Sequence, residues 1–147
     1  MSEEIIKAND VNVTLPEIVR DGINRLGMFV AIDDPESVAS KVAVYNATTE
    51  SMHLADEIGK EIKVRGIVMR PNSFTDADGV TTDVITTTLI DENGVGHMAH
   101  GRGVLSAITN IMGLFGTPDM WPDTMRIVPI SQRGRNGFNF TSLKAIV

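Results

Sequence analysis

The residues best suited to binding chemistry lie in one stretch near the C-terminus, SQRGRNGFNF, residues 131–140. It places Arg133 and Arg135 around a glycine, then an Asn-Gly pair, then Phe138 and Phe140. Arginine attracts phosphate groups whatever the base sequence, and an exposed aromatic ring stacks on any base. A hairpin tip with this composition predicts contact with the backbone and bases of a single nucleic-acid strand.

The same stretch also has a purely structural interpretation. Asn136-Gly137 is typical of a type I′ hairpin turn, and arginines beside such a turn keep the tip soluble. Phe138 and Phe140 share one face of the following strand, whereas the other face carries Leu143, Ala145 and Val147. The sequence leaves open which of the two sets faces the core.

Residues that could bind a metal ion or catalyse a reaction are few. His97 and His100 are three positions apart on an expected strand, so they point to opposite faces and make a poor metal pair. The acids at 76–78 and 91–92 lie in turns, where aspartate is favoured for backbone reasons. Cysteine is absent, and the chain has no nucleophile elbow, phosphate loop or dinucleotide fingerprint. We therefore expect no enzymatic activity, no metal and no cofactor.

Length and composition predict one soluble globular domain. The chain has 147 residues, of which 42% are hydrophobic and 22% charged. No apolar run approaches the roughly 20 residues of a membrane helix, and the first ten residues, MSEEIIKAND, do not resemble a signal peptide. We expect a cytoplasmic protein that makes no contact with membranes.

The charge is unevenly distributed between the two parts of the chain. The formal net charge is −6, but residues 1–57 carry eleven acids and four bases, whereas residues 58–147 carry eight acids and nine bases. We interpret residues 1–57 as an acidic extension packed on the domain and residues 58–147 as a nucleic-acid-binding core. An acidic solvated surface with scattered bases elsewhere is the alternative.

The order of expected elements favours a small barrel. Helices are expected at 16–26 and 47–58, with a weak edge strand at 37–45 between them. Strands are then expected at 60–70, 82–91 and 95–100, a helix at 104–115, and two final strands at 125–131 and 138–147. Gly66 interrupts the first long strand where it would bend. This order predicts a mainly β protein with a five-stranded Greek-key barrel of the OB type, although ferredoxin-like and simple α+β sheets use similar pieces.

In an OB-type barrel the loops between strands one and two and between strands four and five grip the ligand. The first of these loops carries Arg70 and Phe74, and the second is the stretch that opened this section. We expect a groove between them, with Lys63 and Arg65 on the side of the first loop. The full set of predicted nucleic-acid-binding residues is Lys63, Arg65, Arg70, Phe74, Arg102, Arg133, Arg135, Phe138, Phe140 and Lys144.

From about residue 43 onward the chain resembles the OB-fold single-stranded DNA-binding proteins of bacteriophages. The resemblance lies in VYNATTESMHLADEIGKEIKVRGIVM, in TTTLIDENGVGHMAHGRGVLSAITNIMGLFGTP and in the closing hairpin. It implies binding of single-stranded DNA without sequence preference, to protect intermediates of phage replication or recombination in the host cytoplasm. Phage or host replication proteins and further copies of the chain are partners that the sequence leaves open.

Two other functions remain open at this point. One is a phage accessory or virion assembly protein that uses an OB-like barrel for protein contacts. The other is an OB-type module that binds oligosaccharides or proteins. DNA binding predicts an affinity that falls log-linearly with salt, whereas the other two predict no binding to oligothymidine.

Overall fold

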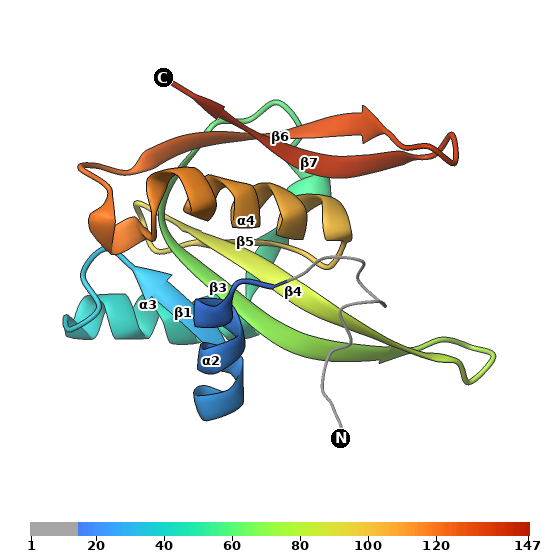
Figure 1. Ribbon diagram of the computed structural model, residues 1–147, viewed down its shortest axis with the longest axis horizontal. Helices are drawn as coiled ribbons and strands as arrows, with labels where there is room; N and C mark the ends of the chain where they lie inside the picture. Colours follow the sequence, from blue (N-terminus) through green and yellow to red (C-terminus); the bar gives the residue numbers. More distant parts are fainter. Residues whose placement is uncertain (1–14) are drawn as a thin grey trace.

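The computed structural model describes residues 15–147, in which one curled sheet is accompanied by three α-helices (Figure 1). Its strands are β1 (Phe29–Ile32), β2 (Ser51–His53), β3 (Ile62–Thr75), β4 (Thr81–Asp91), β5 (Gly96–Ala99), β6 (Met125–Arg133) and β7 (Asn139–Ile146). The helices are α2 (Glu17–Leu26), α3 (Val38–Thr49) and α4 (Arg102–Phe115), with short 3-10 turns η1 (Leu54–Asp56) and η2 (Pro118–Met120). No helix in this part of the chain is long and apolar enough to cross a membrane.

The sheet is mixed and open. Its strands are hydrogen-bonded in the order β2-β5-β4-β3-β6-β7, and β1 pairs with β3 outside this path. The mainly β class is therefore confirmed, and the curled sheet is compatible with an OB-type barrel, but its hydrogen-bonded path does not form the closed five-stranded ring that the sequence predicted. The reason is visible at β5, because β4 occupies one edge of this short strand and β2 occupies the other. No edge of β5 is left for β7 to close the ring.

Helix α4 contacts both β4 and β7 and lies between them (Figure 1). Three of its side chains, Val104, Leu105 and Ile108, are at most 1% exposed in the main core, together with Leu89 of β4 and Leu143 of β7. Apolar residues three and four apart place these side chains on one stripe of the helix. The opposite part of α4 is consequently free to line a surface.

The bend of β3 is confirmed. Its pairing with β4 shifts register between Val64 and Gly66. A β-carbon at Gly66 would lie 3.0 Å from Cγ1 of Ile32, the residue that pairs with Gly66 from β1. Glycine therefore lets β1, a strand that the sequence did not reveal, lie close against β3.

Residues 37–58 fold differently from the prediction. The expected strand at 37–45 and helix at 47–58 were wrong, because α3 spans Val38–Thr49 and is followed by β2 and η1. Ser37 caps α3, with its hydroxyl accepting the N–H of Ser40 at 3.0 Å. Ala43 and Ala47 face the sheet in a second cluster, so the buried stripe of α3 consists of small residues that give little hydrophobic signal.

The remaining elements agree with the sequence to within two or three residues, apart from β3, which runs on to Thr75. Gly27, with φ of 81°, ends α2 as expected. Trp121 packs on the main core beyond α4, and its Nε1 donates to the carbonyl of Gly116 at 2.9 Å. The turn acids also behave as predicted, since Asp76 and Asp91 each accept two backbone N–H bonds within their turns.

Candidate nucleic-acid interface

The β6–β7 hairpin ends in a turn that differs from the predicted one. The Gly137 N–H donates to the Gly134 carbonyl at 3.0 Å, and the Gly134 N–H donates to the Phe138 carbonyl at 2.8 Å. This pattern, with Gly137 at φ of 83°, is a three-residue loop with a glycine bulge rather than a two-residue type I′ loop. Arg135 and Asn136 therefore occupy the two central positions of the turn, at the tip.

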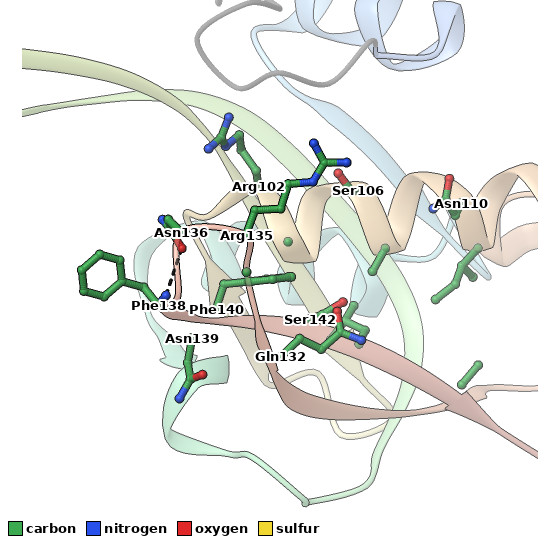
Figure 2. Close-up of a pocket in the computed structure, with 16 residues that line it drawn as sticks. Arg102, Ser106, Asn110, Gln132, Arg135, Asn136, Phe138, Asn139, Phe140 and Ser142 are labelled. Carbon is green, nitrogen blue, oxygen red and sulfur yellow. Dashed lines mark hydrogen bonds between the residues drawn. The ribbon is translucent and has the colours of Figure 1, made fainter.

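The structure decides which face of β7 is buried. Leu143 is 9% exposed, whereas Phe138 is 73% and Phe140 is 41% exposed. Phe138 extends from the hairpin tip away from α4 (Figure 2). Both phenylalanine rings are thus available to a ligand, although Phe140 is also partly packed.

Close approach of β7 to the first turn of α4 depends on Gly103. A β-carbon at this position would overlap the carbonyl oxygen of Thr141 and the ring of Phe140. Only glycine lets the helix and the strand lie this close. The contact fixes Phe140 against the start of α4, beside Arg102.

A groove of about 910 Å³ runs between α4 and the β6–β7 hairpin (Figure 2). Among residues 15–147, its lining contains two arginines, two phenylalanines, six amide or hydroxyl side chains and no carboxylate, although the whole protein is acidic. The polar and aromatic lining residues are Arg102, Ser106, Asn110, Gln132, Arg135, Asn136, Phe138, Asn139, Phe140 and Ser142. The arginines of such a surface attract anions, and its amides and hydroxyls offer hydrogen bonds to the uncharged polar groups of a ligand.

The wall formed by α4 has a simple sequence basis. Arg102, Ser106 and Asn110 are four residues apart, so they form one polar line along a helix whose other side chains, apart from Thr109, are apolar. The N-cap of α4 is Gly101, which provides no side-chain cap for the first N–H groups. The positive end of the helix dipole therefore adds to the charge of Arg102 at this end of the groove.

The sequence prediction found Arg102, Arg135, Phe138 and Phe140 in the groove but missed its polar lining. Ser106 and Asn110 could have been found from their spacing with Arg102, because serine and asparagine are unusual on the faces of a helix packed in a core. Gln132, Asn139 and Ser142 carried no such signal. They reach the groove because the hairpin places them opposite α4.

Arg133 and Lys144 lie on the same hairpin but outside the groove lining. Both are exposed, Arg133 at the end of β6 and Lys144 on β7. They extend the positive charge around the groove. Contact between these two residues and a strand stays a prediction.

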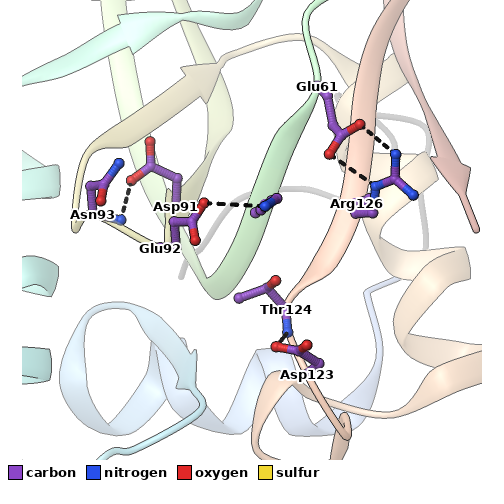
Figure 3. A network of polar contacts seen from close by, with 8 residues as sticks. Glu61, Asp91, Glu92, Asn93, Asp123, Thr124 and Arg126 are labelled. Carbon is purple, nitrogen blue, oxygen red and sulfur yellow. Dashed lines mark hydrogen bonds and ion pairs between the residues drawn. The ribbon is translucent and has the colours of Figure 1, made fainter.

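Lys63 and Arg65 lie away from the groove. Arg65 donates from Nε to Oδ1 of Asp33 at 3.0 Å and from Nη2 to the hydroxyl of Ser40 at 2.8 Å. Lys63 lies 3.8 Å from the carboxylate of Glu92, in a region that also holds the paired side chains of Glu61 and Arg126 (Figure 3). The structure does not bring Lys63 or Arg65 to the hairpin, and their contact with nucleic acid stays a prediction.

Arg70 and Phe74 belong to the β3–β4 hairpin. Nη2 of Arg70 donates to the carbonyl of Thr48 at 2.9 Å, near the C-terminal end of α3. Phe74 is 43% exposed and meets the ring of His100 edge-on, with 4.7 Å between the ring centroids. A binding groove between the two hairpins stays a prediction, because the groove described above has α4 as its second wall and Arg70 and Phe74 lie in a separate cluster.

His97 is a buried polar residue that the sequence did not explain. Its Nδ1 lies 2.6 Å from Oε1 of Glu57, and its Nε2 lies 2.8 Å from Oδ2 of Asp91. His97 and Glu57 are 5% and 4% exposed, so the imidazole joins η1 to the β4–β5 turn inside the protein. Among residues 15–147, no group of histidines and carboxylates is arranged to hold a metal ion.

Comparison with known proteins identifies one family. The family model described as phage single-stranded DNA-binding protein matches residues 24–145, which is most of the chain and includes the whole groove. No curated protein and no solved structure matches the chain.

Proposed function

The chain belongs to the phage single-stranded DNA-binding protein family, and we propose that it holds the strand in the groove between α4 and the β6–β7 hairpin. Binding of single-stranded DNA in phage replication follows from the family. The location of the strand, its contacts and the absence of sequence preference are the proposal.

The observation that carries this location is the groove lining. Two arginines and two aromatic rings share one surface to which the described part of the chain contributes no carboxylate, in a protein with a net charge of −6. A polyanion is repelled by most of such a protein and attracted here. The electrostatic free energy of binding is therefore concentrated in the groove.

The contacts proposed for each side chain follow from its chemistry. Arg102, with the dipole of α4, and Arg135, at the tip of the hairpin, bind backbone phosphates. Phe138 stacks on a base. This contact does not depend on which base is present, because every base has a flat face. The amides and hydroxyls along α4 and β7 bind sugar and phosphate oxygens. These contacts favour a strand of any sequence.

We further propose that β3 to β7 correspond to the five strands of an OB-type barrel, extended by β1 and β2. The meander β3-β4-β5, the pairing of β3 with β6 and the β6–β7 hairpin support this correspondence. The protein then acts without catalysis, coating replication or recombination intermediates in the host cytoplasm. No reaction of the DNA is required for this role.

The test is the salt dependence of binding to a fluorescently labelled oligothymidine. Arg102→Ala with Arg135→Ala should remove about two phosphate contacts and lower the slope of log affinity against log salt by roughly 1.4, at about 0.7 per contact. The matched control is Arg20→Ala with Arg25→Ala, which removes the same charge from exposed positions on α2. A slope that falls equally in the two double variants would contradict the location of the strand.

A further inference from the structure

A second basic cluster lies on the sheet beside the point where β5 leads into α4. It contains His53 of β2, Arg70 of β3 and His100, which follows β5. Nδ1 of His100 is 2.9 Å from the hydroxyl of Thr86 on β4, the residue that pairs with Arg70. The ring of His53 lies 6.3 Å from that of His100. The cluster therefore crosses four neighbouring strands.

The charges around this cluster are unbalanced. Two other arginines of the sheet are tied to acids, Arg65 to Asp33 and Arg126 to Glu61. Arg70 instead binds the carbonyl of Thr48, and His100 contacts Thr86 and Phe74. A negative ligand would thus meet the guanidinium of Arg70 and two imidazole rings that can take up a proton.

We propose that Arg70, His53 and His100 bind a backbone phosphate of the strand held in the groove, and that this binding draws a proton onto His100. Phe74, 43% exposed beside His100, provides a second ring for a base. The inference rests on the proposed function, since it concerns the same strand.

The position of the cluster in the chain connects it to the groove. His100 precedes Arg102 by two residues, so their Cα atoms are at most about 7.6 Å apart. Arg102 lines one end of the groove at the start of α4. A strand that leaves the groove past Arg102 would pass this end of β5 to reach the cluster, which lies on the face of β3 and β4 that also carries α3.

The proton linkage follows from the surroundings of His100. Burial, followed by the nearby charges of His53 and Arg70, holds the pKa of His100 below its ordinary value. The groups that face it are His53 from β2, Arg70 and Phe74 from β3, and Thr86 from β4. In the free protein His100 is therefore neutral at neutral pH. A bound phosphate favours the imidazolium and raises the pKa, so affinity increases as pH falls through the histidine range.

The first experiment measures affinity for labelled oligothymidine from pH 8 to pH 5.5 at constant ionic strength. Each unit by which binding raises the pKa of His100 gives up to about a tenfold gain in affinity at low pH. His100→Gln should lose that gain, so that its affinity changes much less between pH 8 and pH 5.5 than that of the wild type. An oligomer with an uncharged backbone should show no gain with either protein. Equal pH dependence in the wild type and His100→Gln would overturn the inference.

A second measurement needs no variant. Nuclear magnetic resonance titration of His100 in the wild type should show a higher pKa with oligothymidine than without it. His53→Gln should raise the pKa of His100 in the free protein, because it removes one of the groups that lower it. A pKa that does not change on binding, or that inorganic phosphate alone shifts equally, would also overturn the inference. Absence of oligothymidine binding at every pH would instead contradict the proposed function.

Discussion

Replacing Phe138 with alanine separates a binding role from a folding role for the hairpin tip. The side chain is 73% exposed, extends away from α4 and lies one position after the turn glycine (Figure 2). If it stacks on a base, the substitution removes affinity and leaves the fold intact. If its role is structural, the substitution lowers the stability of the fold and leaves the affinity of the folded protein unchanged.

The expected cost in stability is small. Burying a whole phenylalanine side chain contributes about 1.5–3 kcal/mol, and only about a quarter of Phe138 is buried. The loss should therefore be about 0.5 kcal/mol, or a fall of about 1–2 °C in melting temperature for a chain of this size. A phenylalanine in the core would cost about 3–5 kcal/mol.

The expected cost in affinity is larger. Loss of one stacked base amounts to about 1–3 kcal/mol, which is about a 5- to 150-fold weaker affinity for oligothymidine. The salt slope should hardly change, because no phosphate contact is lost. Fluorescence anisotropy at several salt concentrations, with thermal melts by circular dichroism, measures all three quantities.

The matched control is Phe115→Ala. Phe115 is 53% exposed at the end of α4 and does not line the groove, so its substitution should leave affinity unchanged. Equal affinities of Phe138→Ala and Phe115→Ala would refute the stacking role. A loss of several kcal/mol in stability for Phe138→Ala would refute the structural basis of the prediction.

Three further predictions concern other parts of the chain. His97→Ala leaves Glu57 and Asp91 without their buried partner and should cost about 3–5 kcal/mol in urea unfolding; a loss below about 1 kcal/mol would contradict this role. Gly103→Ala should lower the free energy of unfolding by about 1–3 kcal/mol and weaken DNA binding. Gly113→Ala is the control in the same helix, because a β-carbon there meets nothing, and it should raise stability by about 0.5–1 kcal/mol. Neutralising Glu3, Glu4 and Asp10, which lie outside the described residues, should leave DNA affinity unchanged or raise it, and loss of binding with an intact circular dichroism spectrum would contradict that expectation.

Local patterns were enough to predict most strands and the charged and aromatic residues of the proposed binding groove. Alternating apolar residues and glycine-containing turns depend on neighbours in sequence, so β4 to β7 and the ends of α2 and α4 could be read directly. The same holds for the cations and aromatic rings at the β6–β7 tip. Residues 37–58 were misread because α3 buries alanines, whose helical period is hidden by more apolar residues on its exposed face, such as Val42 and Tyr45.

Only the tertiary structure decided which of the predicted residues lie together. Arg65 and Arg135 look equivalent in sequence, but Arg65 is held by Asp33 and Ser40, 32 and 25 residues away, whereas Arg135 stands at a turn tip. The second wall of the groove exists because Gly103 lets α4 approach β7, and the sheet stays open because β2 takes the free edge of β5. These arrangements depend on contacts between segments far apart in the sequence. The energies of such contacts cannot be inferred from local sequence patterns.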